Sequence, residues 1–183
     1  LDQEAKDIWS NIIDANKIVM IYGSGVNLDD FAPSKKIPHT EKYILMSSRM
    51  LLDKGIQEYC MAAERVNRNL DNKVKFKLSG PIDQSSPTSI SKSELEKMVL
   101  KYGVEYLGDR ADMPELLASA TLFVLPSYYS EGLPKVLLEA SACGVPIITT
   151  DHPGCRDAII NKETGLLVSI KDPESLSNAI IEL

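Results

Sequence analysis

Short apolar runs alternate with amphipathic helical patterns from residue 43 to the end of the chain, and this alternation restricts the fold more than any other feature. Strands joined through helices require right-handed crossovers, which make the strands parallel and place helices on both faces of the sheet. The pattern predicts strands at 43–46, 74–78, 104–107, 122–125, 146–149 and 165–168, with helices at 54–70, 91–102, 112–117, 134–143, 155–160 and 176–183. The sequence therefore predicts an α/β fold with a six-stranded, doubly wound, Rossmann-like sheet.

The composition of the strands predicts their order in this sheet. The first, fourth and fifth strands are continuous apolar runs, which are typical of central parallel strands covered on both faces. The second and third alternate between apolar and polar residues, as expected nearer an edge. We therefore expect the order 3-2-1-4-5-6. In that arrangement the winding reverses between the first and fourth strands, and ligands bind beyond the carboxyl ends of those strands.

The first 41 residues precede this alternating pattern. We expect an amphipathic helix over 4–16, a strand over 18–22 and an irregular connector over 27–38. Gly23 and Gly25 form a lone G-x-G, which we interpret as a turn rather than a phosphate-binding loop. The prediction divides the chain into a lead-in helix, strand and interdomain connector over 1–41 and a single globular unit over 42–183.

Composition and charge exclude several classes of function. The net charge of −6 argues against nucleic-acid binding, which needs clustered cations. Three widely spaced cysteines and two distant histidines give neither a disulfide framework nor a metal-ligand pattern, so we expect no metal and no resident cofactor. No signal peptide and no apolar run long enough to span a membrane is found in the sequence. We expect a soluble, cytoplasmic protein.

Charged residues follow the two strands that flank the predicted reversal. Arg49 and Lys54 follow the first strand, in place of the G-x-G-x-x-G of dinucleotide-binding domains. Glu131 follows the fourth strand, and Glu139 lies in the helix over 134–143, for which Pro134 suits the first position and Gly144 the residue past the end.

A nucleotide-sugar diphosphate would suit these residue types. Arg49 and Lys54 can hold the diphosphate together with the free backbone N–H groups near Lys135 and Val136 at the helix start. Carboxylates accept hydrogen bonds from hydroxyls, so Glu139 suits a ribose and Glu131 a sugar.

Each of these residues also has a simpler interpretation. Glu139 can form a surface pair with Lys135, four residues earlier on the same helix, and the two cations can be solvated loop charges. Tyr128 and Tyr129 are more often packing residues than sugar-stacking ones. His152 and Arg156, after the fifth strand, can either rim the site or cap a turn, so these alternatives stay open at this point.

A family resemblance is carried by the residues around Glu131 and Glu139. The E-x7-E spacing between Pro126-Ser127 and Gly144-Val-Pro146 resembles the retaining GT-B glycosyltransferases of the GT4 group. Further segments are similar to motifs of that family: Gly25-Val-Asn27 with Phe31, Arg49, Lys54-Gly55, Gly108 with Leu116, 149–156, and 161–167.

The resemblance implies the carboxy-terminal, donor-binding half of a two-domain GT-B enzyme. By analogy Arg49 and Lys54 hold the diphosphate and stabilise it as it leaves, and Glu139 holds the ribose. Glu131, with the amides of Gly132 and Leu133, holds the transferred sugar. The loop around Arg110 lies near the base. The implied catalytic residues are Glu131, Arg49 and Lys54.

The same resemblance implies sugar transfer with retention and without an essential metal. The donor is expected to be a UDP-sugar that supplies a hexosyl or N-acetylhexosaminyl group to capsule, O-antigen or another cell-surface glycan. The acceptor is expected to be lipid-linked or a growing glycan, bound by an amino-terminal half absent from this chain, so the chain alone should be inactive. The full-length enzyme could then lie at the inner face of the membrane. Two alternatives stay open: a non-catalytic nucleotide-binding module and a GT-B-type sugar-nucleotide epimerase.

Overall fold

The structure is a computed structural model that describes residues 3–19, 21, 23–33, 42–70 and 74–183. Its centre is a six-stranded sheet in the order β3-β2-β1-β4-β5-β6, with every neighbouring pair parallel. The strands are β1 Tyr43–Ser47, β2 Lys75–Ser79, β3 Val104–Tyr106, β4 Leu122–Leu125, β5 Ile147–Thr150 and β6 Gly165–Val168. The predicted doubly wound sheet and its strand order are confirmed.

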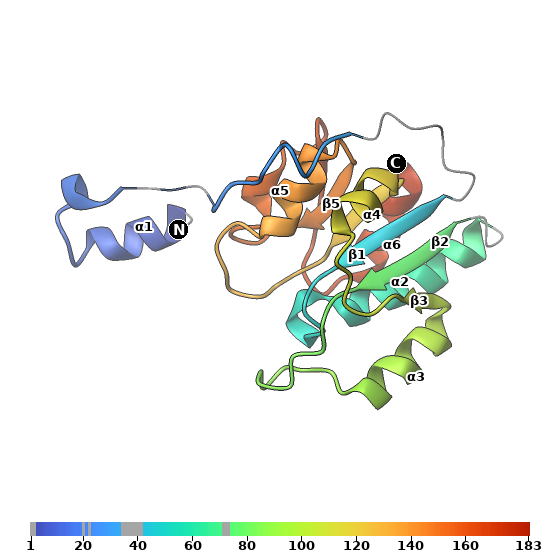
Figure 1. The fold of residues 1–183 in the computed structure, drawn as a ribbon. Coiled ribbons are helices and arrows are strands. Elements are labelled where there is room, and N and C mark those ends of the chain that lie inside the picture. Colours follow the sequence, from blue (N-terminus) through green and yellow to red (C-terminus); the bar gives the residue numbers. More distant parts are fainter. Residues whose placement is uncertain (1–2, 20, 22, 34–41, 71–73) are drawn as a thin grey trace.

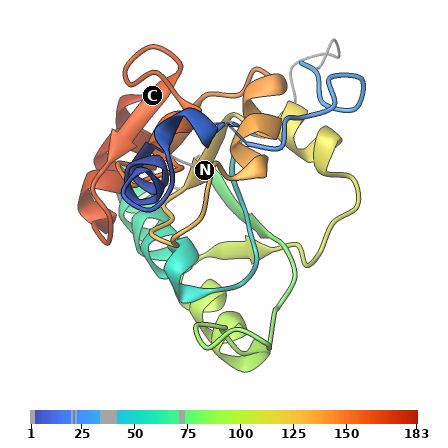
Figure 2. The same cartoon turned by 90° about the vertical axis from the view of Figure 1, so that its left-hand side faces the viewer.

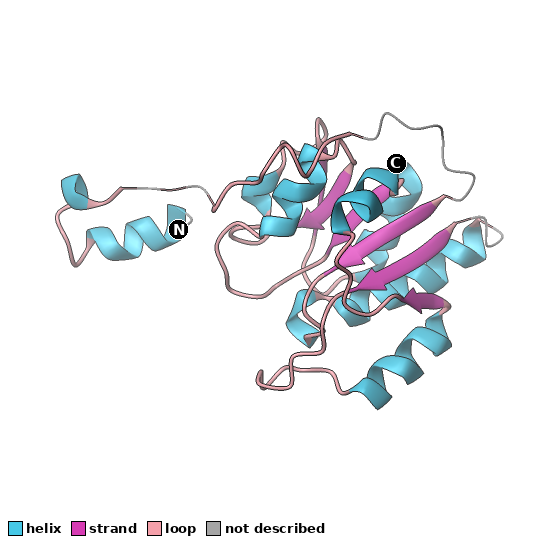
Figure 3. Cartoon of the chain, in the orientation of Figure 1, coloured by secondary structure: helices cyan, strands magenta, loops and turns pink. Residues whose placement is uncertain are grey.

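Helices cover both faces of this sheet (Figure 1, Figure 3). On one face α2 packs against α3 and α6, and on the other face α4 packs against α5. The α-helices are α1 Gln3–Ser10, α2 Ile56–Asn69, α3 Lys92–Tyr102, α4 Met113–Ser119, α5 Lys135–Ala142 and α6 Pro173–Glu182. Three short 3-10 helices are η1 Ala15–Lys17, η2 Leu52–Lys54 and η3 Arg156–Ala158.

The core lies between the sheet and its two helical layers. Every residue of β1, β4 and β5 is buried, which agrees with their continuous apolar sequences and their central places. Tyr59 of α2 is fully buried against Phe76 of β2, with ring centroids 5.6 Å apart. Its hydroxyl lies 2.9 Å from the carbonyl of Ile44 and 3.0 Å from that of Lys77, which satisfies this buried polar group.

The amino-terminal segment stands apart from the sheet. Figure 1 shows α1 well separated from it, and in Figure 2, which views the molecule from that side, α1 lies nearest the viewer. The predicted helix over 4–16 is broken after Ser10 into α1 and η1. The predicted strand over 18–22 is wrong for its described residues 18, 19 and 21, which belong to no strand. Val19 is 78% exposed. Every described strand of the sheet lies at residue 43 or beyond, and none of them pairs with the described residues of this apolar run.

Two other predictions need correction. The helix expected over 155–160 is only η3, because Ile159 already has an extended backbone (φ −137°, ψ 157°). Pro134 is the residue before α5 rather than its first residue, whereas Gly144 has the expected left-handed backbone (φ 71°) just past the helix end. In the connector predicted over 27–38, residues 27–33 form no helix or strand, and the remainder lies outside the described residues.

Among the described residues, no helix is both long and apolar enough to cross a membrane.

Candidate functional site

A cleft of about 280 Å³ opens at the carboxyl ends of β1, β2 and β4, where the winding of the sheet reverses. Seven of the residues singled out from the sequence line it: Arg49, Lys54, Arg110, Glu131, Lys135, Val136 and Glu139. The carboxyl ends of parallel strands meet at one edge, so loops far apart in sequence converge there. The structure therefore brings the two predicted cations and the two predicted carboxylates to a single cleft.

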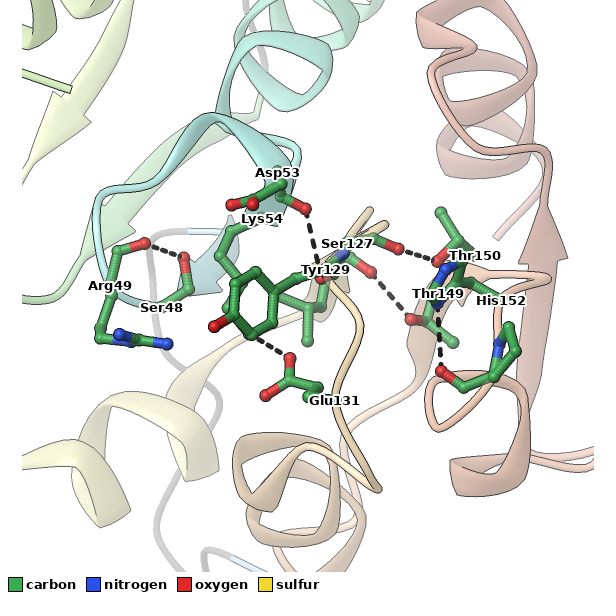
Figure 4. Close-up of polar contacts among 12 residues, drawn as sticks. Ser48, Arg49, Asp53, Lys54, Ser127, Tyr129, Glu131, Thr149, Thr150 and His152 are labelled. Atoms are coloured by element: carbon green, nitrogen blue, oxygen red, sulfur yellow. Dashed lines mark hydrogen bonds and ion pairs between the residues drawn. The ribbon is translucent and has the colours of Figure 1, made fainter. Parts of the chain in front are cut away.

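Lys54 is the most buried charge in this cleft. It ends η2, only 7% of its side chain is exposed, and its ammonium group forms an ion pair with Glu131. The same ammonium lies 4.5 Å from the centre of the Tyr129 ring (Figure 4). A buried lysine needs such partners, because an isolated charge removed from water is costly.

Gly55 explains how Lys54 comes to lie in the cleft. Its backbone is left-handed (φ 81°), which ends η2 and turns the chain into α2. A Cβ at this position would lie 2.2 Å from the carbonyl oxygen of Pro126, just after β4. The absence of a side chain thus lets the loop that carries Lys54 approach the loop that carries Glu131.

Arg49 also lies near the Tyr129 ring. Its guanidinium carbon lies 5.5 Å from the centre of the Tyr129 ring, and its Nη1 donates to Asp83 Oδ2 at 2.9 Å. The hydrogen bond to Asp83 raises the pKa of Arg49 above its ordinary value, which is already high enough to keep a guanidinium charged. Hydrogen bonds from Ser85 and then from Arg49 lower the pKa of the Asp83 carboxyl.

The start of α5 forms a further wall of the cleft. No side chain caps this helix, and Lys135 and Val136 at its start line the cleft. The first N–H groups of a helix have no acceptor within the helix, and the helix dipole gives this end partial positive charge. The backbone N–H groups near Lys135 and Val136, which the sequence indicated, would therefore favour an anion at this wall.

Glu139 lies one turn further along α5 and is largely enclosed. Its side chain is 13% exposed, whereas that of Lys135, whose ammonium lies 3.3 Å away, is 62% exposed. The Lys135–Glu139 pair considered from the sequence is therefore present. Glu139 nevertheless faces the cleft instead of bulk solvent.

The remaining sequence candidates are divided between the cleft and its surroundings. Arg110 lines the cleft next to Asp109 and forms an ion pair of 2.5 Å with Asp112, which raises the pKa of the Arg110 guanidinium. Gly132 and Leu133 do not line the cleft. Gly132 and Leu133 instead pack closely against two other glycines. A Cβ at Gly154 would lie 2.5 Å from the Gly132 carbonyl oxygen, and a Cβ at Gly23 would lie 3.1 Å from the Leu133 side chain.

Residues 149–156, the end of β5 and the turn after it, lie beside the cleft without lining it. Thr149 Oγ1 donates to the Leu125 carbonyl at 2.8 Å, and Thr150 Oγ1 donates to that of Ser127 (Figure 4). Arg156 forms an ion pair of 2.9 Å with Asp151. The two threonine contacts support the end of β4 and the loop after it, whereas the Arg156–Asp151 pair lies within the turn itself. Both favour the turn-forming interpretation of this segment.

Sequence reasoning missed the contribution of the β2 end. Ser79, Gly80 and Pro81 line the cleft, and Asp83 holds Arg49 from outside it. The signal that could have indicated them is the Ser79-Gly80-Pro81 turn after β2, since β2 neighbours β1 in the predicted order. A Cβ at Gly80 would lie 1.9 Å from the Ser48 carbonyl oxygen, so the loops after β1 and β2 are in direct contact.

Comparison with known proteins agrees with this geometry. The family model for glycosyl transferases group 1 matches residues 29–183. The chain belongs to this family. This group 1 glycosyltransferase sequence spans about half the length of the curated relatives described below.

Two curated relatives and one solved structure illustrate the match. The chain is 37% identical over 177 residues to N,N'-diacetylbacillosaminyl-diphospho-undecaprenol alpha-1,3-N-acetylgalactosaminyltransferase of Campylobacter jejuni, covering 90% of this chain and 44% of that protein. It is 29% identical over 182 residues to UDP-Gal:alpha-D-GlcNAc-diphosphoundecaprenol alpha-1,3-galactosyltransferase of Escherichia coli, covering 93% and 46%. The crystal structure of Anabaena HepE in complex with UDP and glucose matches with a TM-score of 0.82 at 20% identity, covering 99% of this chain and 51% of that one.

Proposed function

We propose that this chain is the donor-binding half of a retaining glycosyltransferase that uses a nucleotide-diphospho-sugar. One observation carries the proposal: Arg49, Lys54 and the uncapped start of α5 face one cleft at the reversal of the sheet. Two cations and a helix N-terminus form a site for a doubly charged anion. The carboxylates of Glu131 and Glu139 in the same cleft supply acceptors for the hydroxyls of a sugar and a ribose.

The catalytic effect proposed for these residues is electrostatic. As the bond between sugar and diphosphate breaks, negative charge develops on the leaving diphosphate, and Arg49, Lys54 and the α5 N–H groups stabilise it. Lys54 is paired with Glu131 in the described structure. Donor binding would therefore exchange one Lys54 partner for another, which frees Glu131 to accept from sugar hydroxyls. No metal enters this mechanism.

Other parts of the assignment rest on the family resemblance. The amides of Gly132 and Leu133 are proposed to contact the transferred sugar, although neither residue lines the cleft as it stands. Binding there would require the 131–134 loop to shift. Arg110, which also lines the cleft, is proposed to lie near the base.

The two relatives named above suggest the class of donor and acceptor. Their names specify transfer of N-acetylgalactosamine or galactose to sugars on diphospho-undecaprenol, and one names UDP-Gal as its donor. We propose a UDP-hexose or UDP-N-acetylhexosamine as donor and a lipid-linked glycan as acceptor, in the synthesis of a cell-surface polysaccharide. Acceptor binding would belong to an amino-terminal half, at the cytoplasmic face of the membrane. This chain alone should then show negligible turnover.

Calorimetric titration with nucleoside diphosphates and their sugars tests this proposal. UDP should bind more tightly than GDP or ADP, and Arg49→Ala and Glu139→Ala should each weaken binding about tenfold or more, as expected for the loss of a charged hydrogen-bonding group. Arg68→Ala is a matched control, because Arg68 pairs with Glu64 on the surface of α2 away from the cleft. The assignment fails if no nucleoside diphosphate binds better than millimolar, or if both cleft variants bind like the wild type.

A further inference from the structure

The β2–α3 loop, residues 80–91, holds the loop that carries both cations. Three backbone hydrogen bonds join them: Met50 N–H to the Pro81 carbonyl at 2.9 Å, Leu52 N–H to that of Thr88 at 2.8 Å, and Ile90 N–H to that of Met50 at 3.0 Å. These bonds fix the backbone of the cation loop. They leave the long side chain of Arg49 to be ordered by other contacts.

Asp83 supplies such a contact from outside the cleft. Its Oδ2 accepts from Arg49 Nη1 at 2.9 Å, but Asp83 does not line the cleft, whereas Arg49 does. The other oxygen, Oδ1, accepts from the backbone N–H of Ser85 at 3.1 Å and from its hydroxyl at 2.5 Å. The carboxylate is thus held in place by its own loop before it meets the guanidinium.

The guanidinium is held between this carboxylate and the Tyr129 ring, 5.5 Å from its carbon. Its contact with Asp83 uses one terminal nitrogen. Arginine carries five N–H donors in a planar fork, so donors remain for a ligand in the cleft. Since 42% of the Arg49 side chain is exposed, surrounding packing alone does not fix its rotamer.

We propose that Asp83 is a positioning residue that orders Arg49 for the donor diphosphate. The inference rests on the proposed function, because it concerns how the same site binds its ligand. Ordering a rotamer-rich side chain on binding costs about 0.5–1.5 kcal/mol, and a side chain ordered beforehand avoids that cost. At 1.36 kcal/mol per tenfold, the contribution of Asp83 corresponds to about a two- to twelvefold difference in affinity.

The opposite role would be a latch in which Asp83 competes with the diphosphate for Arg49. A latch carboxylate would have to leave Arg49 before the ligand binds. The Ser85 contacts and the position of Asp83 outside the cleft favour positioning, since a ligand in the cleft can reach Arg49 without displacing Asp83. The two roles predict affinity changes of opposite sign.

A double-mutant cycle with UDP separates these roles. Asp83→Ala should weaken UDP binding two- to twelvefold, leave uridine binding unchanged, and have no further effect in an Arg49→Ala background. Thr88→Val is the matched control: it removes the hydrogen bond from Thr88 to Asp53, 3.1 Å, within the same loop pair, and should leave UDP affinity unchanged. Tighter binding by Asp83→Ala, no change, or an equal loss in both backgrounds would overturn the inference.

A second measurement needs no nucleotide and therefore distinguishes failure of this inference from failure of the proposed function. The Arg49 side-chain Nε–H, assigned by its loss in Arg49→Ala, should show restricted motion in ¹⁵N relaxation of the free protein. Asp83→Ala should make that group as mobile as an exposed arginine. If wild-type protein does not bind UDP, the proposed function fails. If Arg49 is equally mobile with and without Asp83, the positioning role fails.

Discussion

Replacing Gly55 with alanine tests the close approach that brings Lys54 to Glu131. The left-handed backbone at Gly55 (φ 81°) disfavours any L-residue by about 1–2 kcal/mol. The new Cβ would also lie 2.2 Å from the oxygen and 2.7 Å from the carbon of the Pro126 carbonyl. Backbone atoms cannot rotate away as a side chain can, and such overpacking costs about 1–3 kcal/mol more. We expect a total loss of about 2–5 kcal/mol in the free energy of unfolding.

Gly103→Ala is the matched control for this measurement. Gly103 also ends a helix with a left-handed backbone (φ 69°), but a Cβ there would meet no atom within 4 Å. It should therefore lose only the conformational part, about 1–2 kcal/mol. Urea unfolding followed by circular dichroism at 222 nm suits the comparison, because the single tryptophan, Trp9, lies in α1 away from the core. Equal losses in the two variants would refute the argument from close approach.

Three further predictions concern the rest of the fold. Burial raises the pKa of the Glu58 carboxyl, so the free energy of unfolding of the wild type should fall as pH rises from the ordinary carboxyl pKa through this raised value. Glu58→Gln should remove that fall. If urea unfolding shows the same pH dependence from pH 4 to 7 for both proteins, the prediction is contradicted. Tyr59→Phe should lower the free energy of unfolding by about 0.5–1.5 kcal/mol, because it removes the buried hydroxyl that donates to the Ile44 and Lys77 carbonyls. No measurable change in urea unfolding would count against this contact. Burial raises the pKa of all three cysteine thiols, that of Cys60 to about 12. A thiol reagent at pH 8 should therefore modify them rapidly only after the protein unfolds. Rapid modification of the folded protein would show that the thiols are not buried.

The sheet could be predicted from the sequence because each strand carries its own signal. Continuous apolar runs at β1, β4 and β5 mark central strands, and that distinction favours the order that the structure shows. The strand expected over 18–22 shows the limit of this reasoning. An apolar run is only half of the requirement for a strand, and sequence does not show whether a neighbouring strand is present.

The convergence of Arg49, Lys54, Glu131 and Glu139 on one cleft follows from topology, so sequence reasoning could predict it. The pair between Lys135 and Glu139 could be considered from the sequence because the two lie four residues apart on one helix. The ion pairs between loops, Lys54 with Glu131 and Arg49 with Asp83, could not be predicted in the same way. Asp83 lies in a loop with no periodic pattern, and its contact with Arg49 spans 34 residues. The partners of exposed loop charges depend on loop conformation, which composition does not determine. The functional roles of these residues, and the division of the chain at residue 41, stay predictions.

The location of UDP in a crystal of this protein is the most direct test of the central claim. We predict that both phosphate groups lie at the carboxyl ends of β1 and β4, about 3 Å from the nitrogens of Arg49 and Lys54 and from the first N–H groups of α5. The ion pair between Lys54 and Glu131 should be broken in that complex. A UDP molecule whose phosphates lie away from both cations, or at the amino ends of β5 and β6, would contradict the account.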